Sequence, residues 1–257
     1  MLDPACFLSR RGFLSGATAA GAALALSGCT TVRERPVVAE APRPPRPEIG
    51  EEYALMYAAV SDNGFDIPAV PFEKIDAQFL RQVVDDPTGE KPGTLIVDTA
   101  THHLYLVQPG GYAIRYGVGL GRAGFEWAGR AEIRWKQKWP KWTPPDEMIA
   151  RDPSLAKWSA DNGGMPGGLK NPLGARALYI FQGDQDTLYR VHGSPEWWSI
   201  GKSVSSGCVR MINQDVIDLY ERVPQQSPII VTNGLGNPVP DQPGELGEPI
   251  DNGLPTG

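Results

Sequence analysis

The sequence contains little cysteine: Cys6, Cys29 and Cys208 are the three in a chain of 257 residues. So few thiols cannot build the disulfide framework on which many small secreted domains depend. An excess of positive charge is also missing, because the formal net charge is -6. We therefore expect no nucleic-acid partner. The apolar content of 41% suffices for one sizeable hydrophobic core with extensions.

Long hydrophobic runs are scarce near the N-terminus. The apolar stretch at residues 13–26 has 14 residues, whereas a membrane-spanning helix needs about 20. It follows Arg10 and Arg11, and a positive flank before a short apolar stretch is typical of an export signal. The arginine pair resembles a twin-arginine signal, which exports an already folded protein. We interpret residues 1–28 as this signal rather than as a soluble helix, since nothing downstream continues its apolar face.

The segment Leu26-Ser27-Gly28-Cys29 resembles a lipobox, in which cleavage before the cysteine leaves that residue lipidated. We expect Cys29 to anchor the protein to a membrane; ordinary cleavage without a lipid is the alternative. Cys208 would then be the one free thiol of the mature protein. An unpaired thiol in an oxidising compartment is a liability unless it has a function or is deeply buried.

Composition divides the rest of the chain into four parts. Residues 29–50 are predicted to be a proline-rich tether, and residues 51–92 an N-terminal extension packing on the main domain. Residues 93–232 contain short β-rich runs separated by turns, which predict a mainly β sandwich or barrel of mostly antiparallel type with one or two short helices. Residues 233–257 are rich in glycine and proline and are predicted to be a disordered tail.

One of the predicted helices follows Cys208 closely. Asn213 is expected to be its N-cap, residues 216–223 supply its apolar face, and Pro224 ends it. The dipole of this helix would favour a thiolate at Cys208, although the expected cap lies five residues further on.

A histidine and a cysteine sixteen residues apart carry the chemistry that the sequence offers. A thiol becomes an effective nucleophile when a neighbouring base takes its proton, and His192 is the candidate base for Cys208. Gly207 permits a tight turn that would direct backbone N–H groups at a developing oxyanion. A buried structural cysteine and a strand-end histidine are the alternatives. These two alternatives are less favoured when they are considered jointly, because the histidine and the cysteine fall in one segment interrupted by glycines.

Other charged and metal-binding side chains are weaker candidates. Arg210 would hold a substrate carboxylate through its planar guanidinium, or brace the loop by pairing with an acidic residue such as Asp215. His102 and His103 are adjacent, so on a strand they point to opposite faces and cannot share a metal. A zinc site formed by these residues with Cys208 has no recognisable ligand spacing.

Several motifs resemble the L,D-transpeptidase (YkuD-type) catalytic domain. They are His192-Gly193-Ser194, Ser205-Ser206-Gly207-Cys208-Val209-Arg210, Trp142-Thr143-Pro144-Pro145 and Asn171-Pro172-Leu173-Gly174-Ala175-Arg176-Ala177-Leu178. The resemblance covers residues 93–232 and implies a YkuD-like fold, a mainly β sandwich or barrel of mixed strands with one or two short helices. It also implies an acyltransferase acting on peptidoglycan stem peptides, as donor and acceptor, without a cofactor or metal. Cys208 would release D-alanine from a tetrapeptide stem as a thioester, and an acceptor amine would resolve that thioester.

The same resemblance assigns roles to further residues. The Gly193 carbonyl would orient the imidazole, and the Gly207 N–H would contribute to the oxyanion site. Substrate would be bound by residues of the same motifs: Arg210, Ser205, Ser206, Ser194 and Trp142. Many members carry a histidine where this chain has Ser206, so His192 is left as the sole base. Ser194 replaces the usual threonine and keeps the hydroxyl.

Three functions remain open at this point. The first is a membrane-tethered L,D-transpeptidase of the periplasm or cell envelope. The second is a hydrolase of the same fold, an L,D-carboxypeptidase or a wall-protein-releasing amidase, in which water resolves the thioester. The third is an inactive wall-binding lipoprotein, which the presence of both His192 and Cys208 argues against.

The anchor at Cys29 can be tested directly. Cys29→Ala removes the acylated thiol, so the protein should move from the membrane fraction to the soluble fraction of the cell, and processing of the parent should be sensitive to globomycin. Equal solubility of the variant and the parent would contradict a lipid anchor at this position.

Overall fold

The computed structural model describes residues 50–121, 128–205, 207–237 and 239. All of them belong to one compact unit, Glu40–Gly257. The predicted signal, Cys29 and residues 30–49 of the tether lie outside the described residues, as do Ser206, residue 238 and residues 240–257. Within the described part, no helix is long and apolar enough to cross a membrane.

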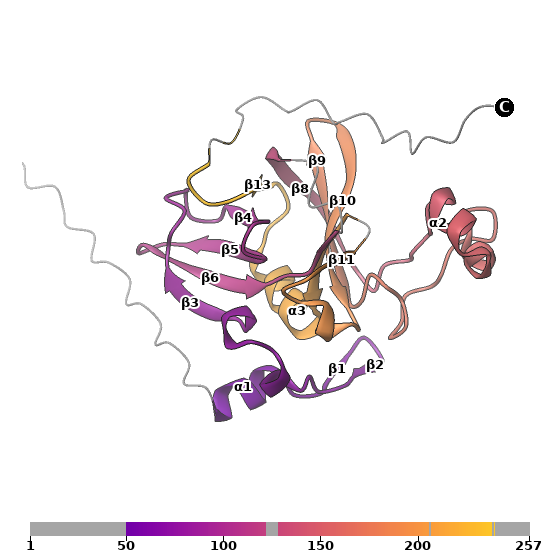
Figure 1. Cartoon of the computed structure of the whole chain (residues 1–257), viewed down its shortest axis with the longest axis horizontal. Helices are drawn as coiled ribbons and strands as arrows, with labels where there is room; N and C mark the ends of the chain where they lie inside the picture. The colour runs from indigo at the N-terminus through magenta and orange to yellow at the C-terminus, as the bar shows by residue number, and fades with distance from the viewer. Residues whose placement is uncertain (1–49, 122–127, 206, 238, 240–257) are drawn as a thin grey trace, which may run out of the picture. The chain divides into compact units, whose positions relative to one another are not determined.

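A nine-stranded mixed sheet dominates the fold, with the strand order β12-β10-β9-β8-β13-β4-β5-β6-β3 (Figure 1). Its strands are β3 (Gln82–Asp85), β4 (Leu95–Asp98), β5 (His103–Gln108), β6 (Tyr112–Gly117), β8 (Gly129–Lys138), β9 (Arg176–Gln182), β10 (Gln185–Ser194), β12 (Val209–Ile212) and β13 (Ser227–Thr232). The β10/β12 and β13/β4 pairs are parallel, and the other neighbouring strands are antiparallel. The prediction of a mainly β fold with mixed strands is confirmed.

Short elements surround this sheet. The α-helices are α1 (Glu51–Met56), α2 (Asp146–Arg151) and α3 (Asn213–Arg222), one more in the described residues than the sequence predicted. The 3-10 helices are η1 (Phe72–Lys74), η2 (Ala77–Phe79), η3 (Pro153–Trp158) and η4 (Trp197–Ser199). Strands β1 (Val60–Asp62) and β2 (Phe65–Ile67) form a hairpin, and β7 (Leu120–Gly121) pairs in parallel with β11 (Ser203–Ser205).

The main core lies between the sheet and α3. Alternate residues of the strands, such as Val191 and Val209, pack in one cluster with Val216 and Leu219 of the helix. The edge strand β12 also bridges to Gly119 beyond β6, through two backbone hydrogen bonds between Arg210 and Gly119 of 2.8 and 2.9 Å. The sheet therefore curls around its core as a partly closed barrel.

Helix α3 begins differently from the sequence prediction. Asn213 is its first residue rather than its cap, and the cap position is taken by Ile212 without a side-chain hydrogen bond. The Asn213 Oδ1 atom instead accepts the Ala175 backbone N–H at 3.0 Å. The cap prediction is wrong because a distant loop occupies the side chain that would have capped the helix.

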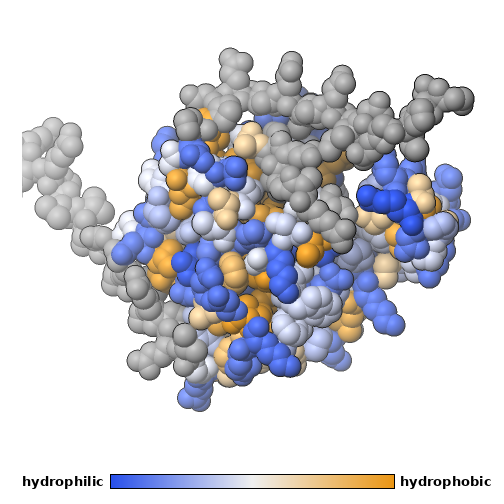
Figure 2. All heavy atoms as spheres, in the orientation of Figure 1, coloured by the Kyte–Doolittle hydropathy of each residue, from blue (hydrophilic) through white to orange (hydrophobic). Residues whose placement is uncertain are grey.

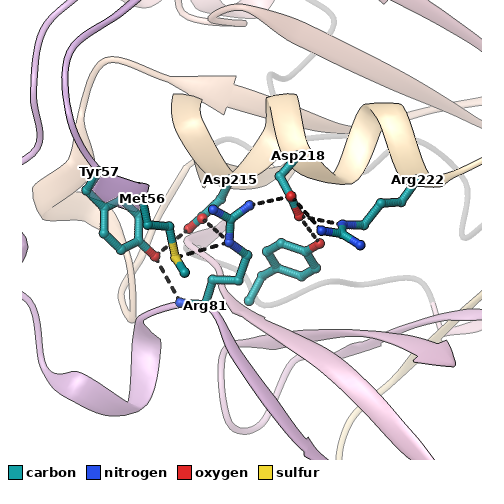
Figure 3. A network of polar contacts seen from close by, with 7 residues as sticks. Met56, Tyr57, Arg81, Asp215, Asp218 and Arg222 are labelled. Carbon is teal, nitrogen blue, oxygen red and sulfur yellow. Dashed lines mark hydrogen bonds and ion pairs between the residues drawn. The ribbon is translucent and has the colours of Figure 1, made fainter. Parts of the chain in front are cut away.

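The extension before the main domain packs on α3 through a buried polar network (Figure 3). The Tyr57 hydroxyl donates to Asp215 Oδ2 at 3.1 Å, and the Arg81 backbone N–H donates to the Tyr57 oxygen at 2.9 Å. The Arg81 guanidinium lies 3.6 Å from Asp215 and 2.8 Å from Asp218. Asp218 also accepts from Tyr116 at 2.7 Å. One arginine thus joins the extension to two carboxylates of the helix.

The buried position of Asp215 determines its ionisation. Burial raises the pKa of Asp215 to about 7, although the Arg81 charge and the Tyr57 hydrogen bond both act to lower it. The ion pair with Arg81 is therefore fully charged only above this pH.

A second polar junction ties the β1/β2 hairpin to the sheet. Asp62 accepts two hydrogen bonds from the buried Arg176, at 2.7 and 2.8 Å, and one from Trp139 Nε1 at 2.7 Å. The ring of Phe65 packs 4.1 Å from the ring of Trp139. The hairpin therefore fixes Arg176, which is the first residue of β9 and directly follows the Asn171–Ala175 loop.

The packed chain continues past the predicted start of the tail at residue 233. Leu235 and Val239 pack against a buried cluster that includes Tyr105 and Ile230. The Thr232 hydroxyl donates to the Gly234 carbonyl at 2.9 Å. Two apolar residues within a Gly/Pro-rich stretch are the reason that this boundary differs from the prediction.

The surface of the described residues mixes polarities. Figure 2 shows hydrophilic and hydrophobic residues side by side on one face. Large hydrophobic side chains with high exposure are Leu55, Trp135, Leu169, Leu188, Trp198 and Val204.

Replacing the arginine of the network should destabilise the fold in a pH-dependent way. Arg81→Met removes the counter-charge of the buried Asp215, whose carboxyl then takes up a proton, so the free energy of unfolding in urea titrations should fall by about 1–2 kcal/mol more at pH 8 than at pH 5. Without Arg81 the pKa of Asp215 rises further, and the carboxyl stays protonated at pH 5 in both proteins. The loss should therefore be smaller at pH 5 than at pH 8.

Arg222→Met provides the matched control, because Arg222 pairs with the same Asp218 from an exposed position. Its loss should be below about 1 kcal/mol. Equal losses in the two variants, or a loss in Arg81→Met that does not grow with pH, would contradict the role given to Arg81.

Candidate active site

The pairing of two parallel strands brings the histidine and cysteine motifs together. In the β10/β12 register Val191 lies opposite Val209, and His192 lies opposite Arg210. Both valines belong to the core, so His192 and Arg210 share the outer face of the sheet. Cys208 directly precedes Val209 and therefore lies beside Arg190. His192 and Cys208 are sixteen residues apart in the sequence, and the pairing of β10 with β12 brings them close together.

His192 is buried, with 4% of its surface exposed, and its ring orientation is fixed by its neighbour. The Nδ1 atom lies 2.6 Å from the Gly193 carbonyl oxygen. A carbonyl only accepts hydrogen bonds, so Nδ1 carries the hydrogen and Nε2 of the neutral ring keeps its lone pair. Burial lowers the pKa of His192 to about 4, and the charges of Arg210 and Arg190 lower it too. The imidazole is thus a neutral base at neutral pH.

The Cys208 residue is partly exposed, and the charges of Arg190 and Arg210 act on its thiol. Burial of its sulfur raises the pKa of the Cys208 thiol, while a hydrogen bond with the Arg190 backbone and the charges of Arg190 and Arg210 lower it in part. The thiol is therefore neutral at neutral pH and needs a base when it attacks. Cys208 leads into β12 rather than into a helix, so the predicted contribution of a helix dipole has no direct structural basis.

Two glycines permit the close approaches around this pair. Gly207 has φ of +127°, a conformation that disfavours other residues, and a Cβ there would lie 3.3 Å from the Tyr189 ring. A Cβ on Gly193 would lie 2.3 Å from Asn213 Oδ1. A side chain at either position would displace the backbone groups that surround His192 and Cys208.

The two arginines are both engaged in ion pairs. Arg210 Nη1 lies 2.6 Å from Glu196 Oε2, so the arginine does pair with an acidic residue, and that residue is Glu196 rather than Asp215, which is buried with the extension. Arg190 was missed in the sequence, although it lies two residues before His192 on the same face of a strand. Its guanidinium bonds both oxygens of Asp186, at 2.7 and 2.8 Å.

The other predicted substrate-binding residues either have structural contacts of their own or lie outside the described residues. The Ser194 hydroxyl is buried and accepts the Glu196 N–H at 3.1 Å, which supports a turn. Trp142 pairs through its backbone with Met165. Ser205 belongs to β11, beside Gly121, and its side chain lies outside the description, as does all of Ser206.

The histidines weighed for a zinc site have other partners. His102 Nε2 lies 3.0 Å from the Ser203 hydroxyl. His103 lies 3.0 Å from the Thr101 hydroxyl and 3.1 Å from the Gln78 carbonyl. In the portion of the chain that the structure describes, no three metal-binding side chains are grouped.

The Asn171–Leu178 motif acts as a structural support. The buried Asn171 amide donates to the carbonyls of Pro140, Met165 and Pro166, at 3.0, 3.3 and 3.0 Å. The next glycine, Gly174, has φ of +59° and lies close against the Gly193 backbone. The Asn171–Leu178 motif, which leads into the neighbouring strand β9, therefore supports the His192-Gly193-Ser194 motif by packing against it.

Comparison with known proteins agrees with this geometry. The family of the YkuD L,D-transpeptidase catalytic domain matches residues 92–231. The probable L,D-transpeptidase ErfK/SrfK of Escherichia coli (strain K12) is 33% identical over 139 residues, which cover 51% of this chain and 41% of that protein. The probable L,D-transpeptidase YbiS of the same strain is 33% identical over 135 residues, with the same coverage. The match thus spans about two fifths of these relatives.

Solved structures give similar matches. One described as a probable carnitine operon oxidoreductase caia from Brucella melitensis is 48% identical and covers 60% of this chain and 94% of that chain, with a TM-score of 0.43. An L,D-transpeptidase from Mycobacterium smegmatis is 21% identical and covers 54% and 58%, with a TM-score of 0.38. The family assignment therefore depends on the sequence match and not on these superpositions.

Proposed function

Because this chain belongs to the family of the L,D-transpeptidase catalytic domain, we propose that it is a cell-envelope L,D-transpeptidase in which Cys208 forms a thioester with a peptidoglycan stem. One observation carries this proposal. His192 holds its Nδ1 hydrogen against the Gly193 carbonyl, on the strand directly beside the one that Cys208 enters. A neutral base next to a neutral thiol is the arrangement that a general-base mechanism needs.

In the first half-reaction the Cys208 sulfur attacks the carbonyl carbon of the third stem residue. His192 Nε2 accepts the thiol proton as the C–S bond forms, and the Gly193 carbonyl stabilises the resulting imidazolium. The backbone N–H groups of Gly207 and Cys208 are proposed to donate to the oxyanion. His192 then gives its proton to the amine of D-alanine as the C–N bond breaks, which leaves the thioester.

In the second half-reaction an acceptor amine attacks the thioester. His192 takes a proton from that amine, and the thiolate leaves and recovers the proton. Water in place of the amine would make the protein a hydrolase, an L,D-carboxypeptidase or a wall-protein-releasing amidase. We favour transfer because the curated relatives are described as probable L,D-transpeptidases.

Substrate contacts are proposed for the arginine and for the motif residues around the thiol. Arg210 would exchange its Glu196 partner for a stem carboxylate, since that pair is partly exposed. Ser205, Ser206 and Trp142 remain proposed contacts through their family motifs. The Ser194 hydroxyl supports the turn after His192, so its contribution would be indirect.

Location follows from the N-terminal sequence. We propose that residues 1–28 direct export and that a lipid at Cys29 ties the protein to a membrane of the cell envelope. The tether at residues 29–50 would let the catalytic domain reach the wall.

Products from a defined muropeptide test the function. The parent protein, incubated with disaccharide-tetrapeptide, should release D-alanine and form cross-linked dimers detectable by mass spectrometry. Cys208→Ala should lower this rate by more than about a thousandfold, and His192→Ala by about a hundredfold or more.

His102→Ala is the matched control, because that histidine contacts Ser203 and not the proposed pair; its rate should stay within about twofold of the parent. Tripeptide without dimers would indicate the hydrolase. If Cys208→Ala leaves product formation unchanged, both enzymatic proposals are excluded.

A further inference from the structure

A row of side chains crosses four strands on the outer face of the sheet and begins at Cys208. Cys208 lies beside Arg190, as the Val191–Val209 register requires. Arg190 lies opposite Tyr179 of β9, and Tyr179 lies opposite Trp135 of β8. The row thus places a thiol, a guanidinium, a phenol and an indole in sequence across β12, β10, β9 and β8.

Arg190, Tyr179 and Trp135 touch one another, and Cys208 is linked to the Arg190 backbone by a hydrogen bond. The Arg190 guanidinium lies over the Tyr179 ring, 4.4 Å from its centroid. The Tyr179 and Trp135 rings are stacked with centroids 4.2 Å apart. These three side chains therefore form a continuous surface that begins beside Cys208.

A β-bulge directs Trp135 onto this face. The β8/β9 register shifts between Ile133 and Trp135, so that Trp135, rather than Arg134, lies opposite Tyr179. Bulges re-aim side chains and are frequent beside functional sites. Trp135 is 42% exposed even though Tyr179 covers one of its faces. An indole face is thus left open at the end of the row.

The charges along the row favour an uncharged ligand at the end formed by Trp135. Asp186 binds both ends of the Arg190 guanidinium, which neutralises the cation nearest the aromatic pair. The electron-rich face of an indole attracts the polarised C–H groups on the face of a sugar ring. A neutral ring of this kind matches Trp135 better than a carboxylate does.

The length of the row matches a peptidoglycan stem. Three strand spacings of about 4.8 Å place Trp135 about 14 Å from the line of Cys208. Three extended residues span about 10–11 Å, and the linkage from the stem to its sugar covers the remaining few ångströms. A donor held as a thioester at its third residue would bring its sugar to the indole.

From this alignment we infer that Trp135 and Tyr179 form a subsite for the N-acetylated amino sugar that carries the donor stem. The inference rests on the proposed function, because the donor is the stem that acylates Cys208. It makes the glycan part of the donor a specificity determinant and places its binding on β8 and β9, away from the reacting atoms.

Binding to the full chain with Cys208→Ala tests the subsite without turnover. Calorimetric titration with disaccharide-tetrapeptide and with the free tetrapeptide should show tighter binding of the former. Adding Trp135→Ala should weaken binding of the disaccharide ligand on the order of tenfold. Binding of the free tetrapeptide should change less than about twofold, and Trp135→Phe, which keeps an aromatic ring, should retain most of the difference.

Trp198→Ala is the matched control, because Trp198 is 52% exposed but lies outside the row; it should leave the ratio of the two affinities unchanged. Equal affinities of the two ligands for the Cys208→Ala protein, or equal weakening of both by Trp135→Ala, would overturn the inference. If the subsite behaves as expected while the parent releases no D-alanine, the proposed reaction fails and the sugar subsite stands.

Discussion

The parallel pairing of β10 with β12 is the constraint on which the site depends. It fixes His192 beside Arg210 and brings Cys208 next to Arg190, so that one register sets four side chains. Val191 directly follows Arg190, and Val209 directly follows Cys208. Both valines are buried in the core, and their burial holds the two strands in this register. A slip of one residue would turn the proposed catalytic side chains into the core. Hydrophobic burial on one face thereby determines the chemistry on the other.

The surrounding elements restrict this pair further. Asn213 at the start of α3 binds the Ala175 N–H and packs against Gly193, whose carbonyl orients His192. The same helix is tied to the extension through Arg81 and its two carboxylates (Figure 3). Residues 50–85, which lie before the family match, therefore support the histidine motif through α3.

Local motifs were predictable and long-range partners were not. Strands such as β4 and β10 follow from short runs of β-favouring residues between turns, and His192 and Cys208 stand out because the chain has few of either residue. The partners of Arg210 and Asn213 depended on folding: Glu196 and Ala175 are reached only after the chain returns on itself. Arg190 could have been found by alternation from His192. Trp135 could not, because its direction is set by a bulge.

The pH dependence of Cys208 alkylation reports whether the thiol and the nearby imidazole of His192 are both neutral. The iodoacetamide rate, corrected with Cys208→Ala for the other two cysteines, should stay low through neutral pH and climb only in the alkaline range, because burial raises the pKa of the thiol and lowers that of His192 to about 4. A rate that reaches its plateau near pH 6 would reveal a thiolate–imidazolium pair and contradict the account.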